Sequence, residues 1–411
     1  MPRLMIICLW LIAATVSVEA SDKDAAITFA LRADYWKYLR EQKANALVQE
    51  KPGKLESAMF AVKEQHIMER FQAGVFGFHP LLGGLETGSG FALGTEYRRP
   101  LTADGRVEMK ARAQASFKGY QRFELGIAAP HVAGDKLFFG LDARQSSSPQ
   151  LPFFGIGSDS QESDKSNYRY DATDVSGTAG VRAARWLEIG TTAGMLNSNS
   201  EAGRDKRSPS IEKLFGAEDV PGLGEQPQYQ YAGVFVRADT RDEPGNPRSG
   251  RMLELNWSGY QDREHRGYSF RRINAEVQQY IPFFNKRRVI ALRGRTVLSD
   301  TSDANAVPFF LQPTLGGSED LRGFREFRFR DRNLMVMNAE YRWEAFSGLD
   351  LALFADAGKV FHNSRQLNLR DLEKSYGFGF RFNTAKSVFW RIDTAFGNEG
   401  PRVFLKFGHV F

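Results

Sequence analysis

The last ten residues of the chain, 402–411, alternate between apolar and polar side chains and end on an aromatic residue. One side of this predicted strand carries Val403, Leu405, Phe407 and Phe411, and the other side carries Arg402, Lys406 and Gly408. A strand with one apolar and one polar face can separate hydrocarbon from a wet lumen, as in an outer-membrane β-barrel. The pattern therefore predicts a transmembrane barrel closed by a strand over 401–411, with Phe407 and Phe411 on its lipid-facing side.

The same two-residue period recurs along most of the chain. It is clearest over 106–117, where apolar residues alternate with Arg106, Glu108, Lys110 and Arg112. The expected strands are 71–79, 88–98, 104–117, 119–129, 135–146, 166–182, 184–197, 228–240, 250–261, 267–281, 286–298, 333–344, 347–359, 373–384, 387–397 and 401–411. Crossing a bilayer at a tilt takes about 9–11 residues, and these lengths bracket that value. The sequence thus predicts an all-β fold, a transmembrane antiparallel β-barrel of about sixteen strands.

The connections between the expected strands differ in length. Short ones are expected at Lys118-Gly119, Ala183-Ala184, Asn285-Lys286, Ala345-Phe346 and Ala385-Lys386. Long ones are expected at 147–165, 198–227 and 299–332. In outer-membrane barrels the short turns face the periplasm and the long loops face the outside. We therefore expect the three long connections on the outer surface of the cell.

The segment before the barrel, residues 1–70, has a different character. An apolar run from Leu4 to Val18 precedes Ala20, so residues 1–20 are interpreted as a signal peptide, with an uncleaved anchor as the alternative. Residues 21–70 carry apolar positions at a helical period, which predicts a short helical segment in the periplasm or in the lumen, or else a disordered tail. The barrel itself is expected over 71–411. Cys8 is the one cysteine and lies in the predicted signal peptide, so no disulfide is expected in the mature chain.

Composition and motif searches exclude several classes of protein. Beyond residue 20 there is no run of about 18 apolar residues, so no transmembrane helix is expected. The net charge of +6 is spread singly along strands instead of forming a patch, which argues against nucleic acid as a partner. The six histidines are scattered, and the chain has no G-x-S-x-G segment, no phosphate loop and no metal-ligand spacing. We therefore predict no enzymatic activity, no cofactor and no metal site.

The longest predicted loop contains the segment Leu321-Arg322-Gly323-Phe324. This segment resembles the (V/L)-R-G-(F/Y) motif in the sixth outer loop of the BamA/TamA outer-membrane assembly superfamily, also called the bacterial surface antigen family. It follows the eleventh expected strand and precedes the twelfth, which is where that family places the motif. The match in both residues and position makes the loop the first candidate functional site.

Two further segments resemble motifs of the same family, F-(Y/F)-G-(I/L)-G and the pair D-x-R and P-x-x-G. The matching residues are Phe153, Gly155 and Gly157 in the third outer loop, and Asp239, Arg241 and Gly250 around the turn between the eighth and ninth strands. Each motif is short, but all three occur at the expected strand positions. The resemblance therefore covers roughly residues 71–411 and implies the same barrel fold.

The arginine of the loop motif needs a partner, because burying a guanidinium group without a carboxylate is costly. The two-residue period turns Asp356 inward on the thirteenth expected strand and Glu340 inward on the twelfth. The resemblance implies that Arg322 pairs with Asp356 and with Glu340. It also implies that Gly323 approaches the wall closely and that Phe324 packs against it. Two interpretations stay open: the pair only tethers the loop, or it takes part in a working cycle.

Two departures from the family bear on function. Assembly members usually carry periplasmic POTRA repeats, each too large for the segment 21–70, so a separate periplasmic accessory protein is an expected partner. The closing strand also has Lys406 where a glycine is common and His409 where an aromatic residue is preferred. Without the repeats the part that captures client chains is missing unless a separate protein supplies it, whereas Phe411 keeps the most diagnostic position of the closing strand.

Two functions fit the expected barrel. The leading hypothesis is insertion or translocation of protein or lipid at the bacterial outer membrane, through a weak seam between the first and last strands; membrane lipid and client outer-membrane proteins are then the partners. Glycines at 74 and 77 would weaken the first strand. The alternative is a passive, porin-like solute channel lined by charges such as Arg272, Arg381 and Arg391.

Overall fold

The computed structural model describes residues 32–45, 74–83, 85, 88–264, 267–384, 387–408 and 411. The chain divides into two units, Met1–Gly53 and Lys54–Phe411. In the first unit the helix α1 (Arg32–Asn45) presents mostly exposed side chains. None of the described helices is long and apolar enough to cross a lipid bilayer. The expected signal peptide over 1–20 lies outside the described residues, as does the segment expected over 21–70 apart from residues 32–45.

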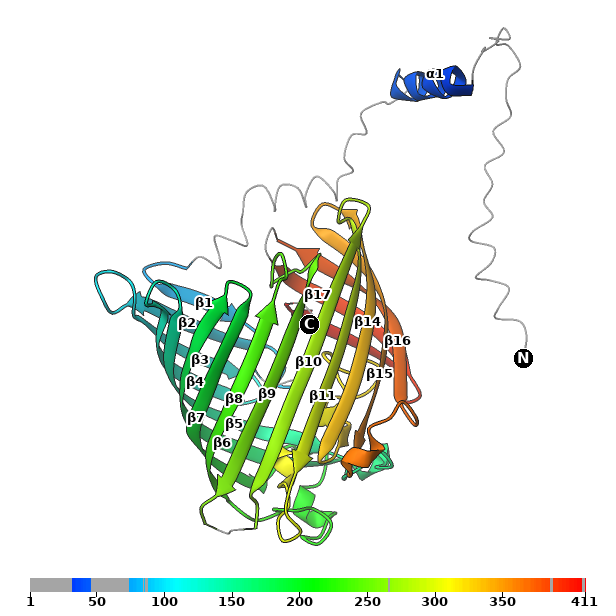
Figure 1. The fold of residues 1–411 in the computed structure, drawn as a ribbon. Helices are drawn as coiled ribbons and strands as arrows, with labels where there is room; N and C mark the ends of the chain where they lie inside the picture. Colours follow the sequence, from blue (N-terminus) through cyan, green and yellow to red (C-terminus); the bar gives the residue numbers. More distant parts are fainter. Residues whose placement is uncertain are drawn as a thin grey trace, which may run out of the picture. The chain divides into compact units, whose positions relative to one another are not determined.

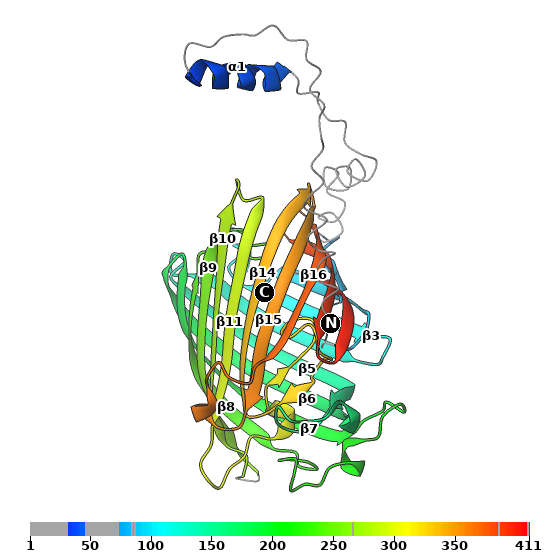
Figure 2. The same cartoon turned by 90° about the vertical axis from the view of Figure 1, so that its right-hand side faces the viewer.

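The second unit is a sheet of sixteen antiparallel strands rolled into a nearly closed barrel (Figures 1 and 2). Its strands, in spatial order, are β1 (Phe78–Leu82), β2 (Ala92–Pro100), β3 (Glu108–Ser116), β4 (Gln121–Val132), β5 (Leu137–Phe153), β6 (Ser166–Ala184), β7 (Leu187–Ala202), β8 (Gln228–Asp239), β9 (Gly250–Asp262), β10 (Phe270–Phe283), β11 (Arg288–Asp300), β14 (Asn333–Phe346), β15 (Leu349–Phe361), β16 (Glu373–Asn383), β17 (Val388–Gly397) and β18 (Gly400–Phe407). Each strand pairs with its neighbours in sequence, so every wall connection is a hairpin. The predicted sixteen-stranded barrel, with a short helix near the N-terminus, is confirmed.

Smaller elements lie in the long connections. The loop between β11 and β14 contains a two-stranded ladder, β12 (Thr314–Leu315) with β13 (Phe329–Arg330), which the two-residue period did not reveal. Single turns of 3₁₀ helix are η1 (Glu162–Asp164), η2 (Ile211–Lys213), η3 (Phe309–Leu311) and η4 (Ser364–Gln366). The ladder shows that the loop is an ordered part of the fold.

The outer face of the wall is apolar and the inner face is polar, as the alternation of apolar and polar residues in the sequence predicts. On β9 the side chains of Leu253, Leu255 and Trp257 are 44–49% exposed and point away from the lumen. Their neighbours in sequence include Glu254, which forms an ion pair with Arg237 of β8. Exposed apolar bands of this extent are stable against hydrocarbon and not against water. The outward face is therefore the lipid-facing face of a membrane barrel.

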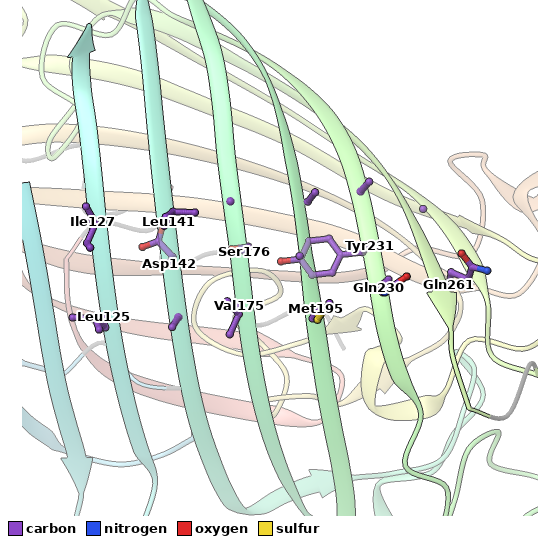
Figure 3. A pocket seen from close by; sticks show the side chains of 16 residues that line it. Leu125, Ile127, Leu141, Asp142, Val175, Ser176, Met195, Gln230, Tyr231 and Gln261 are labelled. Atoms are coloured by element: carbon purple, nitrogen blue, oxygen red, sulfur yellow. The ribbon is translucent and has the colours of Figure 1, made fainter. Parts of the chain in front are cut away.

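A shallow hollow of about 820 Å³ lies in the wall across β4–β9 (Figure 3). Large apolar side chains of its lining, such as Leu141, Val175 and Met195, come from neighbouring strands. Small residues are paired directly across the strands between them, in the order Gly177, Ala193, Ala232 and Gly259. The row of small residues lowers the surface of the wall, so the hollow belongs to the apolar exterior.

Two predictions about the ends of the sheet were wrong. The first strand, expected over 71–79, is β1 at Phe78–Leu82, because Gly74 and Gly77 adopt φ values of +71° and +85° and form a tight turn before it. The closing strand, expected over 401–411, ends at Phe407. Gly408 has φ +85° and turns the chain out of the wall. Phe411 is therefore buried against the inner wall and not on the lipid-facing side.

One connection was assigned to the wrong end of the barrel. The short turn at Lys118-Gly119 joins β3 to β4, and hairpin order places it at the same end as the long loops after β5, β7 and β11. Length alone does not identify an end, because an outer loop can also be short. The long loops themselves begin later than expected, since β5 and β7 extend to Phe153 and Ala202.

Candidate functional site

The connection between β11 and β14, residues 301–332, folds back against the inner wall of the barrel; we call it loop 6. Four of its apolar side chains are buried in one cluster, namely Leu315, Leu321, Phe324 and Phe329. The wall contributes inward-facing apolar residues to the same cluster, which are Val297 of β11, Leu334 and Val336 of β14, and Val360 of β15. Burying these side chains stabilises the loop inside the lumen.

Arg322 lies at the centre of loop 6 and its side chain is fully buried. Its Nη2 and Nε donate to the two carboxylate oxygens of Asp356, at 2.7 and 2.9 Å. Its Nη1 donates to Glu340 at 3.0 Å. The guanidinium carbon also lies 3.4 Å from the centre of the Phe354 ring. The structure thus brings together the three residues that the sequence placed on one loop and two strands.

Glu340 forms ion pairs with arginines of the wall as well as with Arg322 of loop 6. Arg322, Arg342 and Arg381 each place a guanidinium nitrogen 3.0–3.1 Å from its carboxylate. Arg381 also contacts Asp393 at 2.6 Å. Asp393 is shared with Arg391, which donates to the backbone oxygen of Ser318 in loop 6 at 3.1 Å. Four arginines and three carboxylates therefore form one buried network that joins the loop to β14, β15, β16 and β17.

The two residues that follow Arg322 fit against the wall. A Cβ atom at Gly323 would lie 2.5 Å from Cβ of Ser375 and 2.9 Å from Cα of Gly397, so only glycine allows this approach. Phe324 is buried and its ring lies 5.2 Å from that of Phe329. These positions agree with the roles that the family motif implies for Gly323 and Phe324.

The second motif lies beside loop 6. Phe153 ends β5 and packs in a separate buried cluster with Tyr168, Ile211 and Phe309. Gly155 and Gly157 adopt φ values near +100°. The backbone nitrogen of Gly157 donates to the backbone oxygen of Arg330 in loop 6 at 2.7 Å. The motif after β5 therefore supports loop 6 from the outer end of the barrel.

The third motif forms the turn between β8 and β9. Arg241 donates to Asp239 at 2.7 Å, and a side chain at Gly250 would overlap the backbone of Thr240. Burial by itself raises the pKa of Asp242, but hydrogen bonds from Lys286 and from the backbone of Arg248 and Ser249 outweigh it and hold this pKa well below its usual range.

The same turn also reaches the opposite wall. Arg248 pairs with Asp350 of β15 at 3.0 Å, and the nitrogen of Val388 donates to Gly245 at 3.1 Å. The turn therefore crosses the end of the barrel opposite loop 6.

Comparison with known proteins identifies the family. The Omp85 superfamily domain matches residues 107–403. The chain belongs to the Omp85 superfamily. Among solved structures, this Omp85 barrel is similar to BamA from Haemophilus ducreyi lacking POTRA domains 1–3, with 13% identity and a TM-score of 0.57 over 81% of this chain and 68% of that one. It is also similar to CdiB from Escherichia coli, with 11% identity and a TM-score of 0.54 over 81% of this chain and 62% of that one.

CdiB from Acinetobacter baumannii is a further similar structure, with 11% identity and a TM-score of 0.45 over 81% of this chain. The Omp85 chain described here spans about three fifths of either CdiB chain, since it covers 59% and 62% of them. No curated protein sequence matches it significantly. At these identities the similar structures show the fold, and their activities are not transferred from the likeness alone.

Several members of the buried network were not identified as site residues from the sequence. Arg381 and Arg391 were assigned to the lumen but were interpreted as the lining of a channel, and both pair with Asp393. In the Omp85 barrel they are buried ion pairs. Ser375 and Asn338, which donate to Asp356 at 3.2 and 2.9 Å, were missed altogether. Their inward parity was readable, but nothing in a single sequence shows which inward residues meet.

The predicted closing-strand residues separate in space. Phe407 stays on β18, where its ring lies 5.8 Å from that of Phe389 and 6.1 Å from that of Phe91 near β2. Phe411 leaves the wall and contacts Tyr280, Val289 and Ala291 on its inner face. Among the described residues no group of three or more His, Cys, Asp or Glu side chains is arranged to hold a metal ion.

The carboxylate of Glu326 gives loop 6 a titratable contact with the closing strand. It lies 3.9 Å from Nζ of Lys406 on β18 and accepts from the nitrogen of Ser318 at 3.3 Å. Burial raises the pKa of Glu326 from 4.5 to about 7; the nearby Glu319 adds to the rise, while Lys406 and Ser318 oppose it. The folded barrel therefore holds a proton that the unfolded chain has released at intermediate pH.

We expect this proton to make the stability of the barrel depend on pH. Because the folded pKa is raised, the stabilisation is fully present below pH 4.5 and is lost as the pH rises through 7. The loss corresponds to about 3 kcal/mol. Urea unfolding in detergent micelles at several pH values would measure it, with Glu326→Gln as the reference. A difference between wild type and variant that stays constant with pH would contradict the prediction.

Proposed function

We propose that this Omp85 barrel inserts or moves protein or lipid at the bacterial outer membrane through the seam between β1 and β18. The observation that carries the proposal is the open edge of the sheet. Among the described residues no backbone hydrogen bond joins β1 to β18, although every other neighbouring pair of wall strands is joined by an antiparallel ladder. An unpaired strand edge is a template for an incoming strand.

The dimensions of the seam support the same proposal. β1 has five residues, less than half the length of most other strands of the wall, so its removal would disrupt few contacts. A hollow of about 510 Å³ lies where β1 faces the start of β17 and the end of β18. It is lined by Leu81, Leu82, Val388, Phe389 and Phe407, together with Gly245 of the β8–β9 turn. The charged side chains of Glu96, Arg98 and Arg112 also line the hollow, so it offers an entering strand both apolar and polar contacts.

The packing of the lumen weighs against a passive solute channel. A channel requires a continuous wet path lined by charges free to interact with ions. Arg381, Arg391 and Asp393 are buried and paired with one another or with loop 6. Loop 6 and the β8–β9 turn each cross the lumen at a different end. Low or flickering conductance in planar bilayers is expected, whereas a stable anion-selective current would favour the channel.

The proposed partners follow from the proposed function. They are the lipid of the outer membrane, client outer-membrane proteins, and a separate periplasmic accessory protein that delivers the clients. We also propose that residues 1–20 are a signal peptide and that residues 21–70 form a periplasmic or plugging segment. These assignments rest on the sequence patterns and on the bacterial outer-membrane location of the family.

A disulfide across the seam tests the proposal. A Cβ atom at Gly83 would lie 3.7 Å from Cβ of Phe407, which is within the range for a disulfide. The assay is the folding of a urea-unfolded eight-stranded barrel into liposomes, which the wild-type protein should accelerate. The oxidised variant Gly83→Cys/Phe407→Cys should not accelerate it, and reduction of the disulfide should restore the acceleration. Gly83 has φ +68°, so the single variants control for backbone strain.

The matched control is a disulfide within the wall. Thr178 of β6 and Thr192 of β7 are directly paired, and their hydroxyl oxygens lie 3.3 Å apart. Thr178→Cys/Thr192→Cys should oxidise without any change in activity, because these strands are already laddered. Full activity of the oxidised seam variant would contradict the proposal that the seam between β1 and β18 opens.

A further inference from the structure

The hollow of about 510 Å³ beside β1, which we call the seam hollow, is apolar at one end and charged at the other. Its apolar lining comes from the edge of β1 and from β17 and β18, and includes Leu82 and Phe407. Its charged lining comes from β2 and β3, and consists of Glu96, Arg98 and Arg112. The volume is within the range of sites for small molecules. A hollow with two such ends matches an amphiphile, because each end then meets groups of its own kind.

The charged end is built on the carboxylate of Glu96, which is 1% exposed. Nε of Arg98 donates to its Oε1, and Nε and Nη2 of Arg112 donate to its Oε2. One buried negative charge therefore holds two guanidinium groups. Arg112 also lies 3.1 Å from Glu124, which in turn lies 3.4 Å from Arg144. Three arginines and two glutamates leave one positive charge in excess in this cluster.

Arg98 presents the excess charge to the hollow. Its side chain is 60% exposed, whereas that of Arg112 is 27% exposed. Among the described residues only Nε of Arg98 has an acceptor, so Nη1 and Nη2 are available to a ligand. A guanidinium fork with free N–H groups binds a phosphate through paired, charge-assisted hydrogen bonds. The charged end therefore suits the phosphate of a lipid headgroup.

A row of aromatic rings connects the apolar end of the hollow to the outer face of the wall. The ring of Phe389 in the hollow lies 5.8 Å from that of Phe407, which lies 6.1 Å from that of Phe91. Phe91 stacks at 6.3 Å on Phe117. Phe117 and Phe91 are 84% and 46% exposed, as lipid-facing side chains of the wall are. The row crosses the seam, since Phe407 belongs to β18 and Phe91 directly precedes β2, and it gives acyl chains a continuous apolar path.

The seam hollow lies at the end of the barrel that carries the short turns. Its lining includes Gly245 of the β8–β9 turn and Ser387 of the turn between β16 and β17. The nitrogen of Val388 donates to Gly245, so the β8–β9 turn is fixed beside the hollow. Short turns mark the periplasmic end of outer-membrane barrels. The amphiphile within reach is therefore a phospholipid of the periplasmic leaflet.

We propose that the seam hollow binds a glycerophospholipid, with its phosphate on Arg98 and its acyl chains along the rings of Phe407, Phe91 and Phe117. Glu96 positions Arg98 for this contact. A β-strand could use the apolar end, but its backbone carries no anion to pair with the free guanidinium nitrogens. The inference rests on the proposed function and deepens it, by naming a phospholipid as a molecule that enters the seam.

The test uses the purified full-length chain in a neutral detergent. The probe is fluorescently labelled phosphatidylglycerol, and the comparison is diacylglycerol with the same chains and label but without the phosphate. Wild type should bind the phosphatidylglycerol about tenfold more tightly, and Arg98→Gln should abolish that difference. Arg98→Lys, which keeps the charge, should restore part of it. Arg112 still pairs with Glu96 in both variants, and heat-modified migration in gels checks that they are folded.

The matched control is Arg99→Gln. Arg99 is the next residue on β2, is also exposed, and points to the opposite face of the strand. Its replacement removes the same charge from the same strand and should leave both affinities unchanged. Equal weakening by Arg98→Gln and Arg99→Gln would show that only the overall charge matters and would overturn the proposal.

A second measurement locates the acyl chains. The barrel is placed in phosphatidylcholine vesicles that contain phosphatidylglycerol with a photoreactive group at the end of one acyl chain. Labelling is expected on the peptides that contain Phe91, Phe117 or Phe407, and Arg98→Gln should reduce it. Uniform labelling around the wall, equal affinity for the two lipids, displacement of the probe by inorganic phosphate alone, or binding of a strand peptide of residues 250–262 in place of the lipid would each overturn the proposal.

The lipid site and the opening of the seam can fail separately. Lipid binding that depends on Arg98, combined with full activity of the oxidised variant Gly83→Cys/Phe407→Cys, would contradict an opening seam and leave the site standing. Activity that the disulfide blocks, without lipid binding that depends on Arg98, would overturn the site and leave the opening seam standing.

Discussion

Replacing Arg322 with alanine is expected to lower the free energy of unfolding of the barrel by about 3–5 kcal/mol, because the variant leaves the buried carboxylate of Asp356 without its cation. Asp356 would lose three hydrogen bonds from Arg322, two from the side chain and one from the backbone if the loop shifts. Glu340 would keep Arg342 and Arg381. The main loss is thus at Asp356 and in the docking of loop 6.

The measurement is urea unfolding in detergent micelles, together with the temperature at which the folded band is lost in gels. Arg325→Ala is the matched control, since Arg325 is an arginine of the same loop whose ion pair with Glu162 is exposed. Exposed pairs contribute about 1 kcal/mol or less. If both variants lost the same small amount, the buried pair would not hold the loop.

Replacing Glu340 with glutamine is expected to have an effect of similar size, about 3–5 kcal/mol, for the opposite reason. The neutral amide would leave Arg322, Arg342 and Arg381 facing one another in a fully buried site. Arg381 would retain Asp393, and Arg322 would retain Asp356. The excess positive charge should therefore loosen the contact between loop 6 and β14 and increase single-channel conductance in planar bilayers.

The control for this change is Glu254→Gln, which removes a carboxylate from the partly exposed pair with Arg237 on the same wall. It should change stability by about 1 kcal/mol or less and leave conductance unaltered. The double variant Arg322→Met/Glu340→Gln should recover part of the loss at Glu340, because one of the three cations is then gone. A double variant as unstable as the sum of the two singles would show that the groups act independently.

The variants Arg322→Ala and Glu340→Gln also distinguish the two interpretations of the ion pairs that Arg322 forms. If the network only tethers the loop, activity in the liposome assay should follow stability in both variants. If it takes part in a working cycle, a variant that stays folded at the assay temperature should lose activity beyond its loss of stability. Comparing the two readouts at one temperature decides between them.

Much of the fold was predictable from the sequence because the wall repeats one local rule. A residue's face on a strand depends on its parity, so Asp356 and Glu340 were placed inward without any knowledge of the barrel. The arginine motif then identified the loop that needs them. Prediction failed where a single glycine overrides the period, as at Gly408, which ends β18 and sends Phe411 inward.

What remained undetermined was which inward residues meet. Arg381 and Asp393 have the same parity as many wet lumen residues, yet they are buried because loop 6 returns to cover them. The turn between β8 and β9 reaches β15 through Arg248 and Asp350, which are far apart in sequence. Contacts of this kind depend on the curvature of the whole barrel and on the path of its loops, neither of which has a local signature.

The sequence by itself therefore determined the number and order of the wall strands and the face of most of their side chains, because alternation is a property of neighbouring residues. Only the tertiary structure decided which charges pair, where the wall stays open and where Phe411 binds. These features arise when strands distant in sequence enclose a common lumen, and the free energy of each contact then depends on partners that no short segment contains.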